Sequence, residues 1–285
     1  MTRYQPVASS RSSAEAEHAN PPPRISVLIP SFNSARFLRQ ALASVLDQVP
    51  VPQEVLVQDG GSTDDTIDIL RAYEGRVAWV SAPDEGQSDA LNRALARSTG
   101  DVVLWLNADD LLLPGAIAAA SAAFAINPDL SFAYGDFDII DGDGVLVRTY
   151  QSSVYSWDRV FARGCYIFSG SLFIRRQALA EIGGFEARLS ACMDLDLLLR
   201  LGATGRSMHV GRTIGQYRMH DDTKSSTMGL IFLREALRVR LRHAGGSPRL
   251  WLIALGAAIW GALMRATYGL RYSRLWPRYG KGKTL

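Results

Sequence analysis

Asp101-Val102-Val103-Leu104-Trp105-Leu106-Asn107-Ala108-Asp109-Asp110 joins an uninterrupted apolar run to two adjacent carboxylates. The apolar run predicts a strand that is buried on both faces, as in parallel sheets. Ligands of open α/β sheets bind beyond the carboxyl ends of the strands, where these acids would lie. Two neighbouring carboxylates repel each other unless a cation neutralises them, so one interpretation is a site for a hard divalent metal and phosphate oxygens. The other interpretation is an N-cap for the next helix, a role that suits Asp110.

The residues before this stretch alternate between short apolar runs and amphipathic segments. The runs predict strands at residues 25–29, 54–58, 77–80 and 102–106, and Pro30 is expected to stop the first. Between them, apolar residues recur at helical spacing, as in the segment 37–46. Strands that alternate with helices are typical of a doubly wound, mostly parallel sheet, so the expected fold class is α/β.

A less regular pattern follows Pro114. We expect helices at 115–125, 176–182 and 195–201, a strand near 171–174, and a hairpin formed by 132–140 and 145–150. The hairpin turn Asp141-Gly142-Asp143-Gly144 is similar to a calcium-binding loop, but Val147 occupies the position where that loop needs a bidentate Glu. We therefore interpret this segment as a turn.

Polar turns follow three of the predicted strands, at residues 30–33, 58–61 and 107–110. In a doubly wound sheet such turns lie along one edge and converge on one ligand. Asp59 can accept hydrogen bonds from a base or a ribose, and Gly60-Gly61 allows the backbone to approach closely. A helix cap is the alternative for Asp59, and Ser62 with Asp65 has the spacing of a capping box.

Four segments together resemble the family 2 glycosyltransferases of GT-A fold. They are ISVLIPSFN (25–33), EVLVQDGGSTDDT (54–66), DEGQSDALN (84–92) and LWLNADD (104–110), and the resemblance covers about residues 24–226. It implies a GT-A-type doubly wound sheet and an inverting glycosyltransferase that moves a sugar from a nucleotide-diphosphate sugar to an acceptor hydroxyl. It also implies a divalent metal, Mg or Mn, on the diphosphate.

The resemblance assigns roles to single residues in these segments. Pro30 and Ser31 match the turn that contacts the nucleotide, and Asp59 matches the acid that recognises its base. Asp109 matches the last acid of the family's Asp-x-Asp signature, which binds the metal. Asn107 replaces the first acid of that signature, and its amide oxygen can still bond ribose or a metal-bound water.

An acidic motif, Met193-Asp194-Leu195-Asp196, is similar to the family's late motif at the start of a helix. Asp194 matches the acid that acts as the base and removes the proton of the acceptor hydroxyl. Asp196 is the second candidate for this role. Read from the residues alone, Asp194 could instead be a helix cap that complements the helix dipole.

The stretch from Tyr217 to Ser226, in which Arg218 and His220 are followed by Ser, is similar to a segment that closes the active site in many members of the family. His220 could ligate the metal or contact the diphosphate, and Lys224 could neutralise the charge of the leaving group. A structural role is the alternative for His220.

The chain from Gly229 onward has a different composition. It holds 11 Lys and Arg and one acid, Glu235, although the net charge of the whole chain is only +3. Residues 250–264 are all apolar or small, a run shorter than the roughly 20 residues of a membrane-spanning helix. Basic and aromatic flanks favour a helix that lies in the cytoplasmic leaflet against an anionic membrane surface. Packing on the catalytic domain or on a second copy is the alternative, and nucleic acid is not an expected partner.

The sequence thus divides into a disordered segment (1–23), a GT-A catalytic domain (24–228) and a basic, apolar helical tail (229–285). The first segment lacks the apolar run of a secretory signal, and two Cys without metal-ligand spacing suit a reducing compartment. We expect a cytoplasmic enzyme, peripheral on the inner face of the cell membrane. Its expected acceptor is a saccharide or a lipid-linked molecule, in cell-surface polysaccharide or glycolipid synthesis.

Two other classes stay open at this point. A sugar nucleotidyltransferase would also use a metal and a wound sheet, but it should carry a Gly-rich loop after the first strand. A non-catalytic nucleotide-sugar binding subunit would keep Asp59 and Asp109 without needing Asp194.

Overall fold

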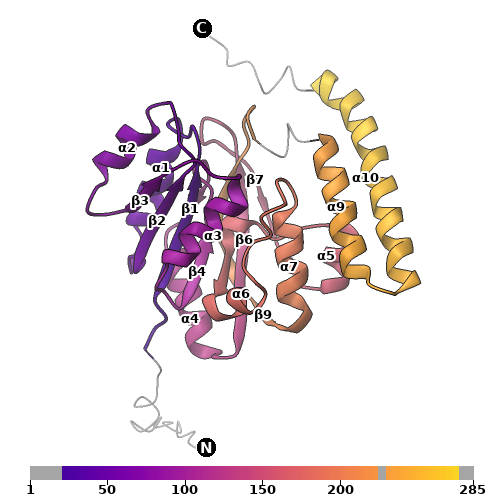
Figure 1. The fold of residues 1–285 in the computed structure, drawn as a ribbon, viewed down its shortest axis with the longest axis horizontal. Coiled ribbons are helices and arrows are strands. Elements are labelled where there is room, and N and C mark those ends of the chain that lie inside the picture. The colour runs from indigo at the N-terminus through magenta and orange to yellow at the C-terminus, as the bar shows by residue number, and fades with distance from the viewer. Residues whose placement is uncertain (1–20, 224–228, 276–285) are drawn as a thin grey trace, which may run out of the picture.

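The computed structural model describes residues 21–223 and 229–275 (Figure 1). Most of the segment expected to be disordered, together with Lys224 and the basic residues beyond 275, lies outside the described residues. The roles expected of them therefore stay predictions.

Four parallel strands form the first half of the sheet. β1 (Ile25–Ser31) lies between β2 (Glu54–Asp59) and β4 (Val102–Trp105), and β3 (Ala78–Ser81) pairs with the outer edge of β2. All four strands were expected, but β1 continues through Pro30, which pairs with Gln58, instead of ending at residue 29. Proline is tolerated here because the pairing of β1 with β4 ends at Leu28, before Pro30 is reached.

Helices cover both faces of these strands (Figure 1). α1 (Leu38–Leu46), α2 (Thr66–Ala72) and α4 (Ala116–Ile126) belong to one buried cluster, and α3 (Gln87–Arg97) belongs to the other. Alternate residues of a strand point to opposite faces, so Val27 joins the first cluster and Leu28 the second. The doubly wound arrangement therefore follows from strands that are apolar on both faces.

The capping box expected before α2 does not form, and that prediction is wrong. The side chain of Asp65 makes no capping hydrogen bond, and the Ser62 hydroxyl donates to the carboxylate of Asp59. Asp59 lies at the carboxyl end of β2, so the loop is held by the strand and not by the helix.

The second half of the sheet is mixed in direction. β8 (Leu172–Arg175) pairs antiparallel with both β4 and β6 (Leu130–Ile140), and β7 (Leu146–Tyr150) forms the expected hairpin with β6. The Asp141 carboxylate accepts the N–H groups of Asp143 and Val145, so the hairpin segment is a turn, as interpreted. β9 (Arg206–Arg218) runs parallel to β6 and pairs with the short β5 (Leu111–Leu112); neither of these two strands was expected.

The remaining helices gather at one side of the sheet: α5 (Trp157–Arg163), the 3₁₀ turn η2 (Ser169–Ser171), α6 (Arg176–Glu181), α7 (Met193–Thr204), α9 (Gly229–Ala244) and α10 (Pro248–Leu275). α9 and α10 lie side by side as the outermost pair (Figure 1). Ala236 and Val239 of α9 and Ala254 of α10 join the buried cluster that contains α7. Leu230, Leu252 and Ile259 of the same pair are exposed. Among the described residues, none of the helices combines the length and apolar character that a membrane crossing requires.

Candidate functional site

The turns that follow β1 and β2 meet at one edge of the sheet. Ser31 is paired with Asp59 in the parallel ladder, and its carbonyl accepts the N–H of Gly60 at 2.8 Å. The backbone N–H of Asn33 donates to the Ser62 hydroxyl at 2.7 Å. Two turns that are distant in sequence are therefore one structural unit, as the convergence argument predicted.

Asp59 organises this unit from within. Its buried carboxylate accepts the N–H groups of Gly61 at 3.0 Å and Ser62 at 2.9 Å, and the Ser81 hydroxyl at 2.7 Å. Gly61 has a φ of +85°, a conformation that an L side chain rarely adopts. The carboxylate thus shapes the loop whose backbone a nucleotide would meet.

The hydroxyl of Ser31 has a different environment. Ser31 is buried, and its Oγ has no hydrogen-bond partner among the described residues. A buried hydroxyl is normally bonded, so this one is available to a bound molecule. Pro30, directly before it, lies buried within β1.

Asn107 connects the end of β4 to the start of α3. Its Oδ1 accepts the side-chain N–H groups of Gln87 at 2.6 Å and Trp105 at 2.8 Å, and its Nδ2 donates to Asp110 at 2.8 Å. The amide oxygen that was expected to bond ribose or a metal-bound water thus already accepts two N–H groups. Gln87 was not anticipated, because it is 20 residues away in sequence.

Asp109 and His220 lie together although 111 residues separate them in the chain. His220 Nε2 is 3.0 Å from Asp109 Oδ2, and the side chains are 10% and 31% exposed. The other ring nitrogen, Nδ1, is buried and has no partner among the described residues. The sequence predicted both as metal ligands, and the structure brings them into contact.

The donor set of this pair fits a divalent cation. A carboxylate oxygen and an imidazole nitrogen are both metal ligands, and a hard cation such as Mg²⁺ is commonly bound by one or two carboxylates together with phosphate oxygens and waters. Within residues 21–223 and 229–275 there is no cluster of three or more His, Cys, Asp or Glu that could hold a metal alone. Phosphate oxygens would therefore have to complete the coordination.

Arg218 holds the acidic turn in place, which the sequence did not indicate. It is buried, its backbone N–H donates to Asp110 Oδ1, and its Nε donates to the carbonyl of Asp109, both at 2.9 Å. Burial and the neighbouring Asp109 carboxylate raise the pKa of Asp110 well above its usual value. Asp110 precedes strand β5 and not a helix, so the helix-cap interpretation of this residue is wrong.

Asp194 lies in the first turn of α7, where its Oδ1 accepts the N–H of Leu195 at 2.7 Å. Burial raises the pKa of its carboxyl group, and a hydrogen bond from the thiol of Cys165 opposes that rise. Asp194 faces a cavity of about 840 Å³ between α5, α7, α9 and α10. A half-buried carboxylate with a raised pKa that faces open space has the properties of a general base.

The start of α3 connects Asp194 with the acidic turn. Ser88 contacts the carbonyl of Leu189 at 3.1 Å and the sulfur of Met193 at 3.6 Å, and Met193 directly precedes Asp194. The adjacent Gln87 contacts Asn107. Two consecutive residues of one helix thus touch both parts of the candidate site.

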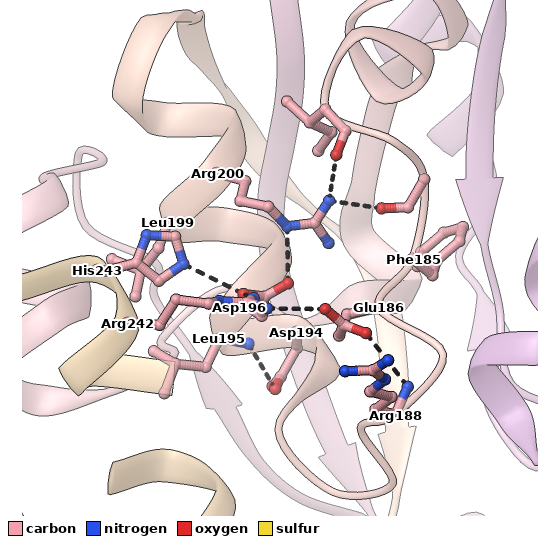
Figure 2. A network of polar contacts seen from close by, with 12 residues as sticks. Phe185, Glu186, Arg188, Asp194, Leu195, Asp196, Leu199, Arg200, Arg242 and His243 are labelled. Atoms are coloured by element: carbon pink, nitrogen blue, oxygen red, sulfur yellow. Dashed lines mark hydrogen bonds and ion pairs between the residues drawn. The ribbon is translucent and has the colours of Figure 1, made fainter. Parts of the chain in front are cut away.

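Asp196 is held in ion pairs, which argues against its predicted role as the second candidate base. Its fully buried carboxylate binds Arg200 Nε at 2.7 Å, His243 Nε2 at 3.1 Å and the guanidinium of Arg242 (Figure 2). These groups lower its pKa to about 2 against the effect of burial. A carboxylate so strongly stabilised in its charged form is a poor proton acceptor, so Asp196 joins α7 to α9.

Glu235 of α9 fastens the loop that precedes Asp194. Its buried carboxylate accepts the backbone N–H groups of Ser190 at 3.0 Å, Ala191 at 2.8 Å and Cys192 at 3.0 Å. The only sequence signal for this role was that Glu235 is the sole acid of a basic segment.

Comparisons with known proteins identify the family of this chain. Residues 26–185 match the family model described as Glycosyl transferase family 2, which ends before Asp194 and His220. The chain is 27% identical over 215 residues to a hyaluronan synthase of Pasteurella multocida, and the aligned region covers 74% of this chain and 22% of that protein. It is 30% identical over 201 residues to a PGL/p-HBAD biosynthesis glycosyltransferase of Mycobacterium bovis, and the aligned region covers 66% of this chain and 75% of that protein. The chain thus spans about a fifth of the length of the hyaluronan synthase.

Solved structures of similar fold include two with bound nucleotide sugars. S. aureus TarS 1–349 in complex with UDP-GlcNAc has a TM-score of 0.61 and 19% identity, over 84% of this chain and 81% of that one. The mannosyltransferase PcManGT from Pyrobaculum calidifontis, in complex with GDP-Man and Mn²⁺, has a TM-score of 0.56 and 20% identity, over 89% of this chain and 83% of that one. At these identities the likeness establishes the fold.

Proposed function

The chain belongs to glycosyl transferase family 2 and has the GT-A fold, and from this premise we propose that it is an inverting glycosyltransferase. It would transfer a sugar from a nucleotide-diphosphate donor to an acceptor hydroxyl. The observation that carries the proposal is the contact of Asp109 with His220 at the edge of the sheet where the turns of Ser31 and Asp59 also lie.

The donor would bind along this edge. Ser31, through its unbonded hydroxyl, and the loop shaped by Asp59 would contact the nucleotide, with Pro30 setting the path of the chain. Asn107 would support the site by holding Gln87 and Asp110 in place. Lys224 keeps its proposed role at the leaving group.

Asp109 and His220 would hold a divalent metal, Mg or Mn, and a Mn²⁺ ion is present in the complex of PcManGT. When bound, such an ion neutralises charge on the departing diphosphate. Among the described residues these two side chains supply one oxygen and one nitrogen ligand, and the diphosphate itself would supply others.

Asp194 would act as the base in a single displacement. The acceptor oxygen forms a bond to the anomeric carbon while the bond from that carbon to the diphosphate oxygen breaks. The hydroxyl proton passes to Asp194, and the nucleoside diphosphate leaves with the electron pair, so the anomeric configuration inverts. The raised pKa of Asp194 makes its carboxylate a stronger acceptor for this proton.

We propose a peripheral position on the cytoplasmic face of the membrane, with a role in surface polysaccharide or glycolipid synthesis. Exposed Leu230, Leu252 and Ile259 on α9 and α10 support it, because apolar side chains among basic residues suit an anionic lipid surface. The polysaccharide role is supported by the relative named as a hyaluronan synthase.

A donor panel tests the proposed activity. Purified protein is incubated with nucleotide sugars and Mg²⁺ or Mn²⁺, and release of nucleoside diphosphate is measured. We expect release from one donor class that stops on chelation of the metal. Asp194→Asn should slow transfer by about 10²- to 10⁴-fold while donor binding persists. Full transfer by a folded Asp194→Asn protein would refute the base assignment.

A further inference from the structure

The cavity beside Asp194 is built largely by the two C-terminal helices. Its volume is about 840 Å³, and it extends from Asp194 and Cys165 to α10. The walls from α9 and α10 are predominantly apolar and include Phe232, Leu233, Ala236, Ile253, Ala257 and Trp260. A polar end at the candidate base and an apolar remainder give this cavity an amphipathic character.

Arg240 adds a buried positive charge to the cavity lining. It is 7% exposed, and its Nε and Nη1 donate to the backbone carbonyls of Phe161 at 2.5 Å and Ala236 at 3.2 Å. In the part of the chain that the structure describes, Arg240 forms no ion pair. Burial accordingly lowers its pKa. Buried charges are normally paired, so this guanidinium lacks the anion that its position calls for.

The apolar wall continues to the outer surface of the helix pair. Phe232 and Trp260 line the cavity and are also 40% and 66% exposed. Arg163, an exposed residue of α5, lines the same cavity. A molecule with an anionic head and an apolar chain could therefore place its head at Arg240 and its chain against α10.

We propose that this cavity is the acceptor site and that it takes a lipid bearing a phosphate. The phosphate pairs with Arg240, the chain lies between α9 and α10, and the reacting hydroxyl reaches Asp194. This inference rests on the proposed function for the identity of the hydroxyl, but the binding of the amphiphile is measurable without it.

Calorimetric titration of the full chain tests the site directly. The probe is lysophosphatidic acid with a 12-carbon acyl chain below its micelle concentration, and the uncharged monoacylglycerol of the same chain is its control. The native protein is expected to bind the phosphate-bearing probe at least about tenfold more tightly, which corresponds to about 1.4 kcal/mol. Equal affinity for the two probes would overturn the role of Arg240.

Gly256→Phe is designed to fill the cavity. Gly256 lines it, and a Cβ built on this residue meets nothing within 4 Å, so the added ring has room without a backbone clash. Leu252→Phe is the matched control, because Leu252 lies on the same helix, is 72% exposed and does not line the cavity. Thermal unfolding establishes that both variants fold.

We expect Gly256→Phe to weaken binding of the phosphate-bearing probe at least about tenfold and Leu252→Phe to leave it unchanged. Arg240→Met should weaken binding of the phosphate-bearing probe and leave binding of the uncharged probe unchanged. Native affinity in a folded Gly256→Phe protein would place the lipid on the outer surface and refute the site. If the native protein is a dimer that Gly256→Phe dissociates and Leu252→Phe does not, a second copy of the chain occupies the cavity and the lipid site is refuted.

Asp109→Ala separates this inference from the proposed activity. It should abolish metal-dependent nucleotide binding and leave binding of the probe intact. If the native protein binds the probe but no nucleotide sugar, the proposed glycosyltransferase activity is refuted and the lipid site is not.

Discussion

Among the described residues, Asp194 accepts a side-chain hydrogen bond from one titratable neighbour, the thiol of Cys165, so the protonation of its carboxylate can be tested with a single substitution. The Cys165 thiol donates to its carboxylate, while burial disfavours the charged form. The two effects act in opposite directions on the pKa of Asp194. The N–H of Leu195 and the thiol of Cys165 together therefore limit how far burial can raise that pKa.

Cys165→Ala removes the donor and should raise the pKa of Asp194 further. The base is active when ionised, so the acidic limb of the pH–rate profile should move to higher pH. The measurement is kcat/KM against pH, with Cys165→Ser as the control that keeps a donor. Identical acidic limbs in the native and Cys165→Ala proteins would show that the thiol does not influence the base.

His220→Gln should weaken Mn²⁺ binding in the presence of nucleoside diphosphate by at least about tenfold, because it removes the imidazole ligand opposite Asp109. Electron paramagnetic resonance of free Mn²⁺ measures the affinity. His209→Gln is a matched control, because His209 Nε2 lies 2.8 Å from Asp136 in a similar pair on β9 and β6. Equal losses in both variants would mean that the effect is not local to the proposed metal site.

At the scale of elements, polar contacts at two places join α9 to α7 and to the loop before it. Glu235 binds the loop before α7, and Asp196 of α7 binds Arg242 and His243 at the other end of α9 (Figure 2). In the first attachment the acid lies on α9 and accepts neutral backbone N–H groups, and in the second it lies on α7 and pairs with basic side chains. The start of α7, and with it Asp194, is therefore positioned by a helix outside the family-model match.

Glu235→Gln should lower the free energy of unfolding by about 1–3 kcal/mol, because the charge-assisted bonds to three backbone N–H groups are weakened. Urea unfolding measures this change. Glu235→Gln should also lower kcat more than it raises the KM of the donor, because the loop that Glu235 binds leads into Asp194 and not into the donor site. Arg234→Gln, at an exposed neighbouring position, serves as the control. Unchanged stability and kcat would show that the loop keeps its position without Glu235.

The parallel half of the sheet could be predicted because its signals are local. The apolar runs before Asp59 and Asn107 identify their strands, and the polar residues after them identify the edge. β9 could not be predicted, because Gly, Arg and His interrupt any alternation of apolar residues along it. The bonds of Arg218 to the acidic turn and of Glu235 to the loop before α7 were not foreseen either, because the partners lie 109 and about 45 residues away.

At the scale of the whole molecule, the helix pair α9 and α10 carries a large share of the exposed apolar side chains of the described residues. α9 and α10 use their inner residues to pack on the catalytic core, and their outer residues remain exposed. Packing on the domain and contact with a membrane were alternatives for this segment at the level of sequence. In the structure the inner residues of the pair pack on the domain, and the exposed outer residues leave membrane contact as a proposal.

Leu252→Glu combined with Ile259→Glu should abolish flotation with anionic vesicles. Both side chains are exposed, so two added carboxylates should repel the lipid surface without disturbing the core. Co-flotation with vesicles that contain phosphatidylserine measures binding, and Val145→Glu with Val147→Glu on the exposed hairpin is the control. Undiminished flotation would contradict attachment through this face.

The hydrogen bond between Asn107 and Asp110 keeps the charge of the acidic turn low. An ionised acid at position 107 could not donate to Asp110, and it would add a third carboxylate to a turn where one already has a raised pKa. The amide at position 107 therefore allows Asp109 and Asp110 to follow each other in one turn, because it bonds to Asp110 without adding charge.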